Sequence, residues 1–321
     1  MHLLIPFAFC SSDGCTSALP SLKLPHLEKL LSRLTPKPLE VGDEFSLSPP
    51  HERALARALG LPLQDGLTPW AALQAAQTDI ARLAGSAWAF ITPCHWQVGT
   101  HQIAMSGQAL ADFSEQESQT LLANMRPYFE EDGIALHFEQ PSRWLAQGDM
   151  FRDLATASLD RVVGRSVENW MPRSASAASL RRLQNEMQML LYTHPVNDAR
   201  IARGVPPVNS FWLSGTGALP DPLPTPTTEP TPVVASSLRD AALNEDWATW
   251  VKAWQALDAG ECAALLAALD QNPKGTHSSG IQLTLCGERN VQSFTLRQQP
   301  YLKRFMNLFS TQPSSNILEK L

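Results

Sequence analysis

The stretch His194–Gly217, HPVNDARIARGVPPVNSFWLSGTG, holds the densest group of conformationally special residues in the chain. Asn197 or Asp198 can cap a short helical turn, and Gly204 can end it. The two prolines that follow fix the backbone in an extended form. The stretch therefore predicts a helix end, a capped turn and an extended run, joined by a rigid backbone.

A rigid loop of this kind can hold polar side chains in fixed positions. An arginine guanidinium matches planar anions with two parallel hydrogen bonds, which suits a phosphate or a carboxylate. The candidate ligand contacts are Asn197, Arg200, Asn209 and Ser210. A purely structural loop, whose Asn side chains bond to their own backbone, explains the same residues. Gly215–Gly217 is not a dinucleotide-binding motif, because no helix is expected after it.

Hydrophobic periodicity predicts helices on both sides of this stretch. Helical spacing of apolar residues occurs at 24–34, 49–60, 176–192 and 238–270. Another helix starts at a capping box made by Ser114 and Glu117, and Pro127 is expected to interrupt it. Trp247, Trp250 and Trp254 share one helical stripe and are expected to pack in a core rather than form a ligand box.

Short apolar or alternating runs predict strands between these helices. They lie at the N-terminus and at 86–92, 101–105, 134–139 and 281–296, with the strands at 86–92 and 101–105 expected side by side and 281–296 forming two strands around a turn. The alternation of strands and helices predicts an α/β fold with a mostly parallel sheet flanked by helices. Six prolines between Pro220 and Pro232 mark an internal boundary.

Composition limits the class of protein. The chain has 321 residues, 44% of them hydrophobic, which is enough for a sizeable core. A net charge of −6, without a segregated basic face, argues against nucleic acid as a partner. No run approaches the ~20 apolar residues of a membrane span. Five scattered cysteines indicate reduced thiols in a cytoplasmic protein, and Cys10 and Cys15 lack the further ligands of a zinc site.

The residues at 194–217 resemble a segment of the cofactor-independent phosphoglycerate mutases, above all the archaeal-type branch of the alkaline phosphatase superfamily. LPHLEKL (24–30) and PPHERALARALG (49–60) resemble that family's first helix and its nucleophile segment, and ATASLDRVVGRSVENWMP (155–172) falls where the family has a further shared run. The chain is also similar to the RpfE-type regulatory proteins. The resemblance implies an alkaline phosphatase-like core at 1–85 and 218–321, with a Pro-rich loop at 218–234, and an inserted α/β substrate-type domain at 86–217.

A mutase of this class needs two metal ions held by Asp and His, and a Ser that accepts the phosphoryl group. The resemblance places other residues at these positions. His51 stands at the nucleophile position with Ser48 nearby, and Pro6, Glu52, Glu261, Glu288 and Arg289 stand at or beside metal-ligand positions. A guanidinium at a metal position would set a permanent positive charge against the cation.

The sequence therefore favours a mutase-like protein without its metal centre and nucleophile, acting in regulation or ligand sensing and holding no cofactor. The first alternative is an active cofactor-independent phosphoglycerate mutase or related phosphohydrolase with two divalent metals, Mn or Zn. The second is a purely structural interaction protein. The expected partners are a phosphorylated or carboxylate small molecule and, for the regulatory role, another protein; nucleic acid and membrane are not expected.

Overall fold

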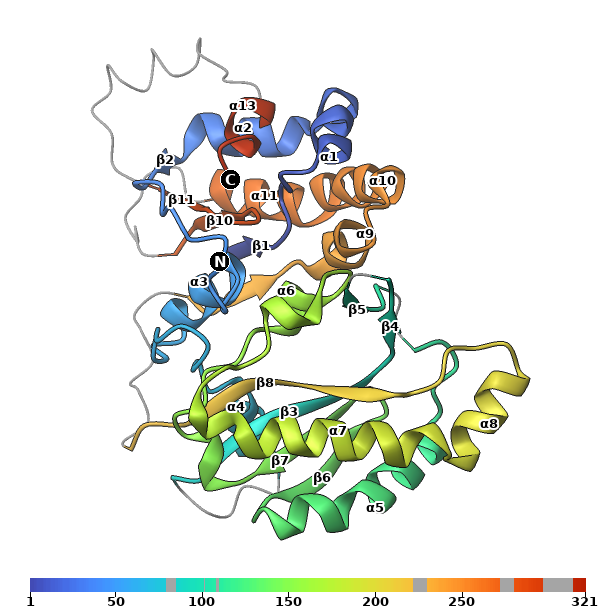
Figure 1. Cartoon of the computed structure of the whole chain (residues 1–321). Helices are drawn as coiled ribbons and strands as arrows, with labels where there is room; N and C mark the ends of the chain where they lie inside the picture. The colour runs from blue at the N-terminus through green and yellow to red at the C-terminus, as the bar shows by residue number, and fades with distance from the viewer. Residues whose placement is uncertain (79–84, 101, 108–109, 222–229, 272–279, 297–313) are drawn as a thin grey trace. The chain divides into compact units, whose positions relative to one another are not determined.

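The computed structural model describes residues 1–78, 85–100, 102–107, 110–221, 230–271, 280–296 and 314–321 (Figure 1). The chain divides into two compact units. The first contains residues 1–45, 49–60 and 225–321, and the second contains residues 46–48 and 61–224. Residues 61–78 thus pack with the second unit, although the resemblance assigns them to the core domain. The two units are described separately below.

The first unit is built on a mixed five-stranded sheet, so the prediction of an α/β fold is confirmed. The strands are β1 (His2–Ile5), β2 (Thr35–Pro36), β9 (Pro232–Val234), β10 (Gln282–Cys286) and β11 (Val291–Thr295), in the order β2-β11-β10-β1-β9. β1 pairs in parallel with both β9 and β10. β11 pairs antiparallel with both β10 and β2. The predicted pair of strands around a turn at 281–296 is the β10–β11 hairpin.

The helices of the first unit cover the two faces of this sheet unequally. They are α1 (Asp13–Ala18), α2 (Pro25–Arg33), α3 (Pro50–Ala58), α9 (Arg239–Leu243), α10 (Trp247–Leu257), α11 (Ala263–Gln271) and α13 (Ser314–Leu318), with 3-10 turns η1 (Leu19–Ser21) and η5 (Ser236–Leu238) and a π-helical turn η6 (Asp258–Cys262). The main core joins Leu3, Leu283 and Trp254 with α2, α10 and α11. On the other face, α3 packs Ala54 against Leu4.

The second unit contains a four-stranded sheet that is antiparallel throughout. Its strands are β3 (Ala87–Cys94), β6 (Ala135–Gln140), β7 (Arg143–Gln147) and β8 (Ser210–Ala218), in the order β6-β7-β3-β8. A separate pair is formed by β4 (Trp96–Val98) and β5 (Ile103–Met105). The strands predicted at 86–92 and 101–105 are therefore not neighbours, because the intervening β4 pairs with β5. Residue 101 lies outside the described residues.

Helices cover both faces of the antiparallel sheet. They are α4 (Trp70–Ala76), α5 (Glu115–Glu131), α6 (Leu159–Val162), α7 (Ala178–Tyr192) and α8 (Pro195–Ala202), with 3-10 turns η2 (Asp149–Phe151), η3 (Val167–Asn169) and η4 (Ala175–Ala177). Successive residues of β3 point to opposite faces. Ala89 and Ile91 join the core under α5 and α7, whereas Trp88 packs against α4.

The helix at the capping box runs through Pro127 to Glu131, so the predicted interruption is wrong. A proline inside a helix removes one hydrogen bond and costs about 3 kcal/mol. Met125 and Phe129 lie on either side of it and are both buried in the core of the second unit. Their burial offsets the lost bond. The helix ends at Glu131, and Gly133, whose φ of 70° suits glycine, follows its C-cap residue Asp132.

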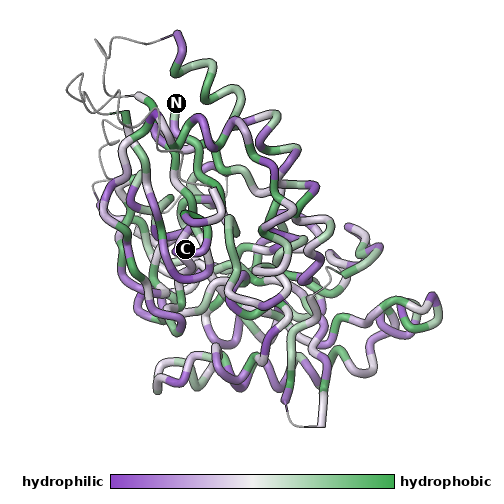
Figure 2. Tube along the Cα trace, turned by 90° about the horizontal axis from the view of Figure 1, so that it is seen from above, coloured by the Kyte–Doolittle hydropathy of each residue, from purple (hydrophilic) through white to green (hydrophobic). Residues whose placement is uncertain are grey.

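In the described part of the chain, no helix is long and apolar enough to cross a membrane. Figure 2 shows hydrophilic and hydrophobic residues alternating at short intervals along the trace. This alternation is typical of helices and strands that bury one face and leave the other in water.

Candidate functional site

The structure brings together the residues that follow β1 and those at the start of α3. Phe7 follows Pro6 directly after β1, and its φ of 53° is unusual for a residue other than glycine. Its ring lies 5.2 Å from the ring of His51, the first residue after Pro50 in α3. His51, at the nucleophile position of the resemblance, thus packs against the ring of the residue that follows Pro6, which the resemblance places near a metal-ligand position.

The backbone around Phe7 is fixed by two hydrogen bonds. The indole Nε1 of Trp250 donates to the carbonyl oxygen of Phe7 at 3.0 Å. The amide of Ala8 donates to the carbonyl oxygen of Cys286 at 2.8 Å, which keeps this turn beside the end of β10. Since Trp250 is completely buried, the turn is tied directly to the core of the first unit.

The residues after β10 make polar contacts of their own. Glu288 accepts hydrogen bonds from the backbone amide and the hydroxyl of Ser11. Arg289 forms an ion pair with Glu44, and its carbonyl oxygen accepts from Nη2 of Arg53 at 3.3 Å. The carboxylate at one metal position is therefore engaged by Ser11, and a guanidinium occupies the next position.

Glu261 and Asp258 lie in the π-helical turn η6 and differ sharply in exposure. Glu261 is exposed, whereas Asp258 is only 2% exposed. Asp258 accepts hydrogen bonds from the backbone amides of His26 and Leu27, at 3.2 and 2.7 Å, and contacts Nδ1 of His26 at 2.9 Å. It caps the start of α2, whose own N-cap residue, Leu24, has no capping side chain. The sequence did not predict a role for Asp258, which lies three residues before Glu261 in the same turn.

Ser48 belongs to the second unit and closes a turn there. It is 4% exposed, and its hydroxyl accepts from the amide of Gly66 at 2.9 Å. Asp65 accepts from the backbone amides of Leu47 and Ser48, at 2.9 and 2.8 Å. Partial burial alone would raise the pKa of Asp65, but these hydrogen bonds, with those from the side chains of Ser46 and Ser48, lower it overall. This geometry gives Ser48 a structural part in the turn.

The loop after α7 begins with a helix that starts earlier than predicted. His194 is the N-cap of α8, and its Nδ1 accepts from the amide of Val196 at 3.1 Å. Asn197 and Asp198, the expected caps, lie inside the helix because Pro195 already occupies its first position. Gly204 follows the helix with a φ of 73°, in agreement with the prediction.

Asn197 ties the two ends of this loop together. Its Nδ2 donates to the carbonyl oxygens of Leu191 and Val208, at 2.8 and 2.7 Å, and its Oδ1 accepts from the amide of Val208 at 2.8 Å. Asn209 ties the end of the loop to β4: its side chain accepts from the amide of Trp96 and donates to the carbonyl oxygen of Trp96. Asn197 thus bonds to backbone groups at the two ends of its own loop, as the structural alternative expects, whereas Asn209 bonds to a strand far away in the sequence.

Arg200 is completely buried and makes three contacts. Its Nε donates to the carbonyl oxygen of Pro206 at 2.9 Å, Nη2 donates to that of Ala111 at 2.9 Å, and Nη1 lies 3.2 Å from Glu117. Ser210, the remaining predicted contact, is 1% exposed, and its hydroxyl has no hydrogen-bond partner among the described residues. Three of the four predicted contacts, Asn197, Arg200 and Asn209, are thus engaged in hydrogen bonds within the fold.

The ligand set of a two-metal centre is not assembled in the described residues. There, no group of three His, Cys, Asp or Glu side chains lies close enough to hold a metal ion. The residues at the strand ends do not fit such a centre either, because a phenyl ring offers no ligand atom and a guanidinium repels a cation.

Comparison with known proteins connects part of the chain to the mutases. No protein-family model matches it. A segment of 69 residues is 32% identical to a 2,3-bisphosphoglycerate-independent phosphoglycerate mutase of Methanothrix thermoacetophila, and it covers 22% of this chain and 18% of that protein. The chain therefore matches less than a fifth of the length of this relative.

Two solved structures align over most of the chain with low similarity. A cofactor-independent phosphoglycerate mutase from Thermoplasma acidophilum aligns with 12% identity and a TM-score of 0.36, over 100% of this chain and 99% of that one. The PH0037 protein from Pyrococcus horikoshii aligns with 13% identity and a TM-score of 0.39, over 92% and 87% of the two chains.

Proposed function

We propose that this protein is a phosphoglycerate mutase-like protein that has lost phosphoryl transfer and acts in ligand sensing or regulation. The observation that carries the proposal is the ring contact between Phe7 and His51, 5.2 Å apart. His51 stands at the nucleophile position of the resemblance, and Phe7 directly follows Pro6, which stands near a metal-ligand position. Neither ring can serve as the metal-activated hydroxyl on which this chemistry depends.

The charges nearby support the same conclusion. Arg289 brings a permanent positive charge to a metal position and is held there by Glu44. Glu288 is bonded to Ser11. A two-metal centre would need both positions to present carboxylate or imidazole groups to the same cations. The regulatory part of the proposal rests on the similarity to the RpfE-type proteins, and the alkaline phosphatase-like core rests on the similarity to the mutases.

The test is to measure metal content and mutase activity on the same purified protein. After incubation with Mn²⁺ or Zn²⁺ and removal of free metal, we expect less than one metal ion per chain and no interconversion of 2- and 3-phosphoglycerate. Stoichiometric metal together with turnover that disappears in Ser48→Ala would overturn the proposal. Because Ser48 closes a turn, Ser48→Ala could lose activity by unfolding. His51→Ala, at the nucleophile position itself, therefore serves as a second variant, and a thermal melt of each variant establishes that it is folded.

A further inference from the structure

One face of the sheet in the first unit carries a row of buried polar side chains. All five residues of β10 are buried, and alternate residues point to opposite faces. Leu283 and Leu285 face the main core, whereas Gln282 and Thr284 face the other way. On that second face, α3 covers Leu4 and Cys286, so the polar residues line a cleft beside the helix.

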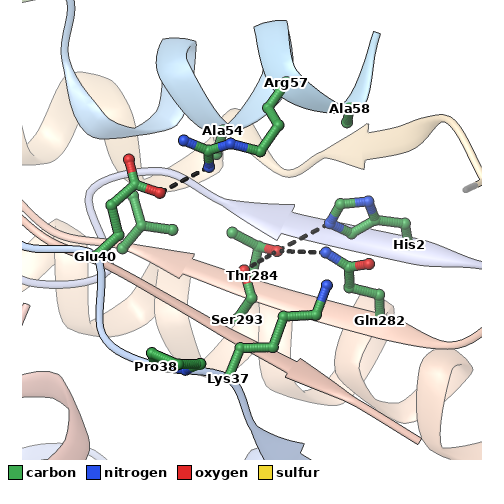
Figure 3. Close-up of a pocket in the computed structure, with 11 residues that line it drawn as sticks. His2, Lys37, Pro38, Glu40, Ala54, Arg57, Ala58, Gln282, Thr284 and Ser293 are labelled. Atoms are coloured by element: carbon green, nitrogen blue, oxygen red, sulfur yellow. Dashed lines mark hydrogen bonds and ion pairs between the residues drawn. The ribbon is translucent and has the colours of Figure 1, made fainter. Parts of the chain in front are cut away.

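The floor of this cleft is a connected hydrogen-bond network. Nε2 of His2 lies 2.9 Å from Oγ1 of Thr284, which in turn lies 3.1 Å from the hydroxyl of Ser293 (Figure 3). Nε2 of Gln282 reaches the same Thr284 oxygen at 3.4 Å. His2 and Thr284 are only 2% and 1% exposed. Hydroxyl groups can donate or accept, so this floor can adapt to either kind of group on a ligand.

The rim of the cleft carries more positive than negative charge. Among the described residues, Lys37 and Arg57 line it together with one carboxylate, Glu40. Arg57 pairs with Glu40 at 2.7 Å, and Arg53 approaches the same carboxylate at 3.7 Å. One carboxylate is thus shared by two guanidiniums. Figure 3 shows the Lys37 side chain extending over the strands towards Gln282.

The dimensions and the charge together define the class of ligand. The cleft has a volume of about 530 Å³, within the range of small-molecule sites. Its rim is cationic in a protein whose net charge is −6, so the local field differs in sign from the overall charge. A guanidinium and an ammonium bind oxyanions, and the polar floor suits hydroxyl groups.

We propose that this cleft binds a small hydroxylated organic anion, with its phosphate or carboxylate at Arg57 and Lys37 and a hydroxyl group at Ser293, whose own hydroxyl is positioned by Thr284. The site lies beside α3, on the sheet face that carries His2 and Gln282, the first residues of β1 and β10. It is separate from Phe7, Glu288 and Arg289, which follow the ends of the same strands. The cleft is a location for the proposed ligand sensing. Binding there follows from the geometry and charge of the cleft and does not depend on the proposed function.

The experiment is a calorimetric titration of the full chain with three probes at low salt. Glycerol 3-phosphate carries a phosphate with hydroxyls, glycerate carries a carboxylate with hydroxyls, and glycerol carries no charge. We expect one or both anions to bind and glycerol not to bind. Arg57→Gln and Lys37→Met should each weaken binding roughly tenfold, the loss of one charge-assisted contact. Thr284→Val should weaken it without changing its dependence on salt, because the hydroxyl carries no charge.

Lys252→Met is the matched control, since Lys252 is exposed on α10 and does not line the cleft. It should bind as the wild type does. Arg57 and Lys37 lie at the rim, and thermal melts of the ligand-free variants check that they remain folded. Absence of binding by both anions, equal binding of glycerol, or unchanged affinity in both rim variants would overturn the proposal. Mutase turnover with added metal would overturn the proposed function but would leave the binding result standing.

Discussion

The guanidinium of Arg200, completely buried, lies 3.2 Å from the carboxylate of Glu117, 83 residues earlier in the chain. Glu117 also accepts from the backbone amide of Ser114 at 3.0 Å and pairs with Arg203 at 2.7 Å. Partial burial of Glu117 would raise its pKa, but these donors together lower it. One carboxylate therefore closes the capping box of α5 and anchors α8.

Replacing Arg200 with Ala should destabilise the protein by roughly 3–5 kcal/mol, because it breaks an ion pair whose guanidinium is completely buried and removes the donor to the carbonyl groups of Pro206 and Ala111. Arg203→Ala is the matched control: its side chain is 47% exposed and pairs with the same carboxylate, so about 0–1 kcal/mol is expected. Urea unfolding followed by circular dichroism measures both. Equal effects of the two substitutions would show that burial of Arg200 does not set the strength of the contact.

Asn197→Ala should cost about 1–3 kcal/mol for each of the two buried backbone groups of Val208 that lose this partner, whereas the carbonyl of Leu191 still accepts from the amide of His194. Asn124→Ala makes the same change on the exposed side of α5, where the amide donates only to the carbonyl of Thr120, and should stay within about 0.5 kcal/mol. Thermal melts of the two variants compare them. A small loss at Asn197 would mean that water replaces its bonds.

The stability of the protein should fall as the pH drops below about 6.5, the ordinary pKa of His. Burial lowers the pKa of His194. The unfolded chain therefore binds a proton before the folded chain does, and the stability that His194 contributes at neutral pH is lost as the pH falls through its folded-state pKa. His194→Asn keeps a capping side chain without this titration. Its unfolding free energy should change less between pH 7 and pH 5 than that of the wild type, and identical slopes would contradict the assignment.

Cys10, Cys94, Cys262 and Cys286 differ in burial, and their thiols should react in two classes. Burial raises the pKa of Cys262 to about 12 and raises those of Cys94 and Cys286 as well, so few of these thiols ionise at pH 8. Cys10 is only partly buried. Labelling of the folded protein with a chromogenic disulfide should show a fast phase from Cys10 that Cys10→Ser removes. Rapid reaction of Cys286 before unfolding would refute this order.

Periodicity and capping rules predicted the local elements well. The helix at 178–192, the capping box of Ser114 with Glu117, and the buried Trp250 and Trp254 all follow from spacing along the chain. The sequence predicted a mostly parallel sheet, whereas the four-stranded sheet of the second unit is antiparallel. Alternation of apolar residues shows which side chains are buried but not how strands pair. Pro127 was misjudged because tertiary packing decides whether a helix tolerates it.

The sites were harder to predict than the elements. The sequence predicted a rigid stretch at 194–217, but the hydrogen-bond partners of Asn197 and the pairing of Arg200 with Glu117 depend on folding. The cleft has no signature in the sequence, since His2, Lys37 and Thr284 come from three distant segments. Side chains that meet only through sheet register cannot be read from spacing.

The pairing of His2 with Gln282 also constrains how the protein is made. The first strand leaves the ribosome early, yet its neighbour on one side starts at Pro232 and its neighbour on the other at Gln282. At about 5–20 residues per second, β1 waits on the order of tens of seconds for both. Residues 61–224 are complete by then, so during synthesis they can fold while the first strand is still without its sheet. Unshielded strand edges promote association between chains, which makes this interval the period of greatest exposure to aggregation.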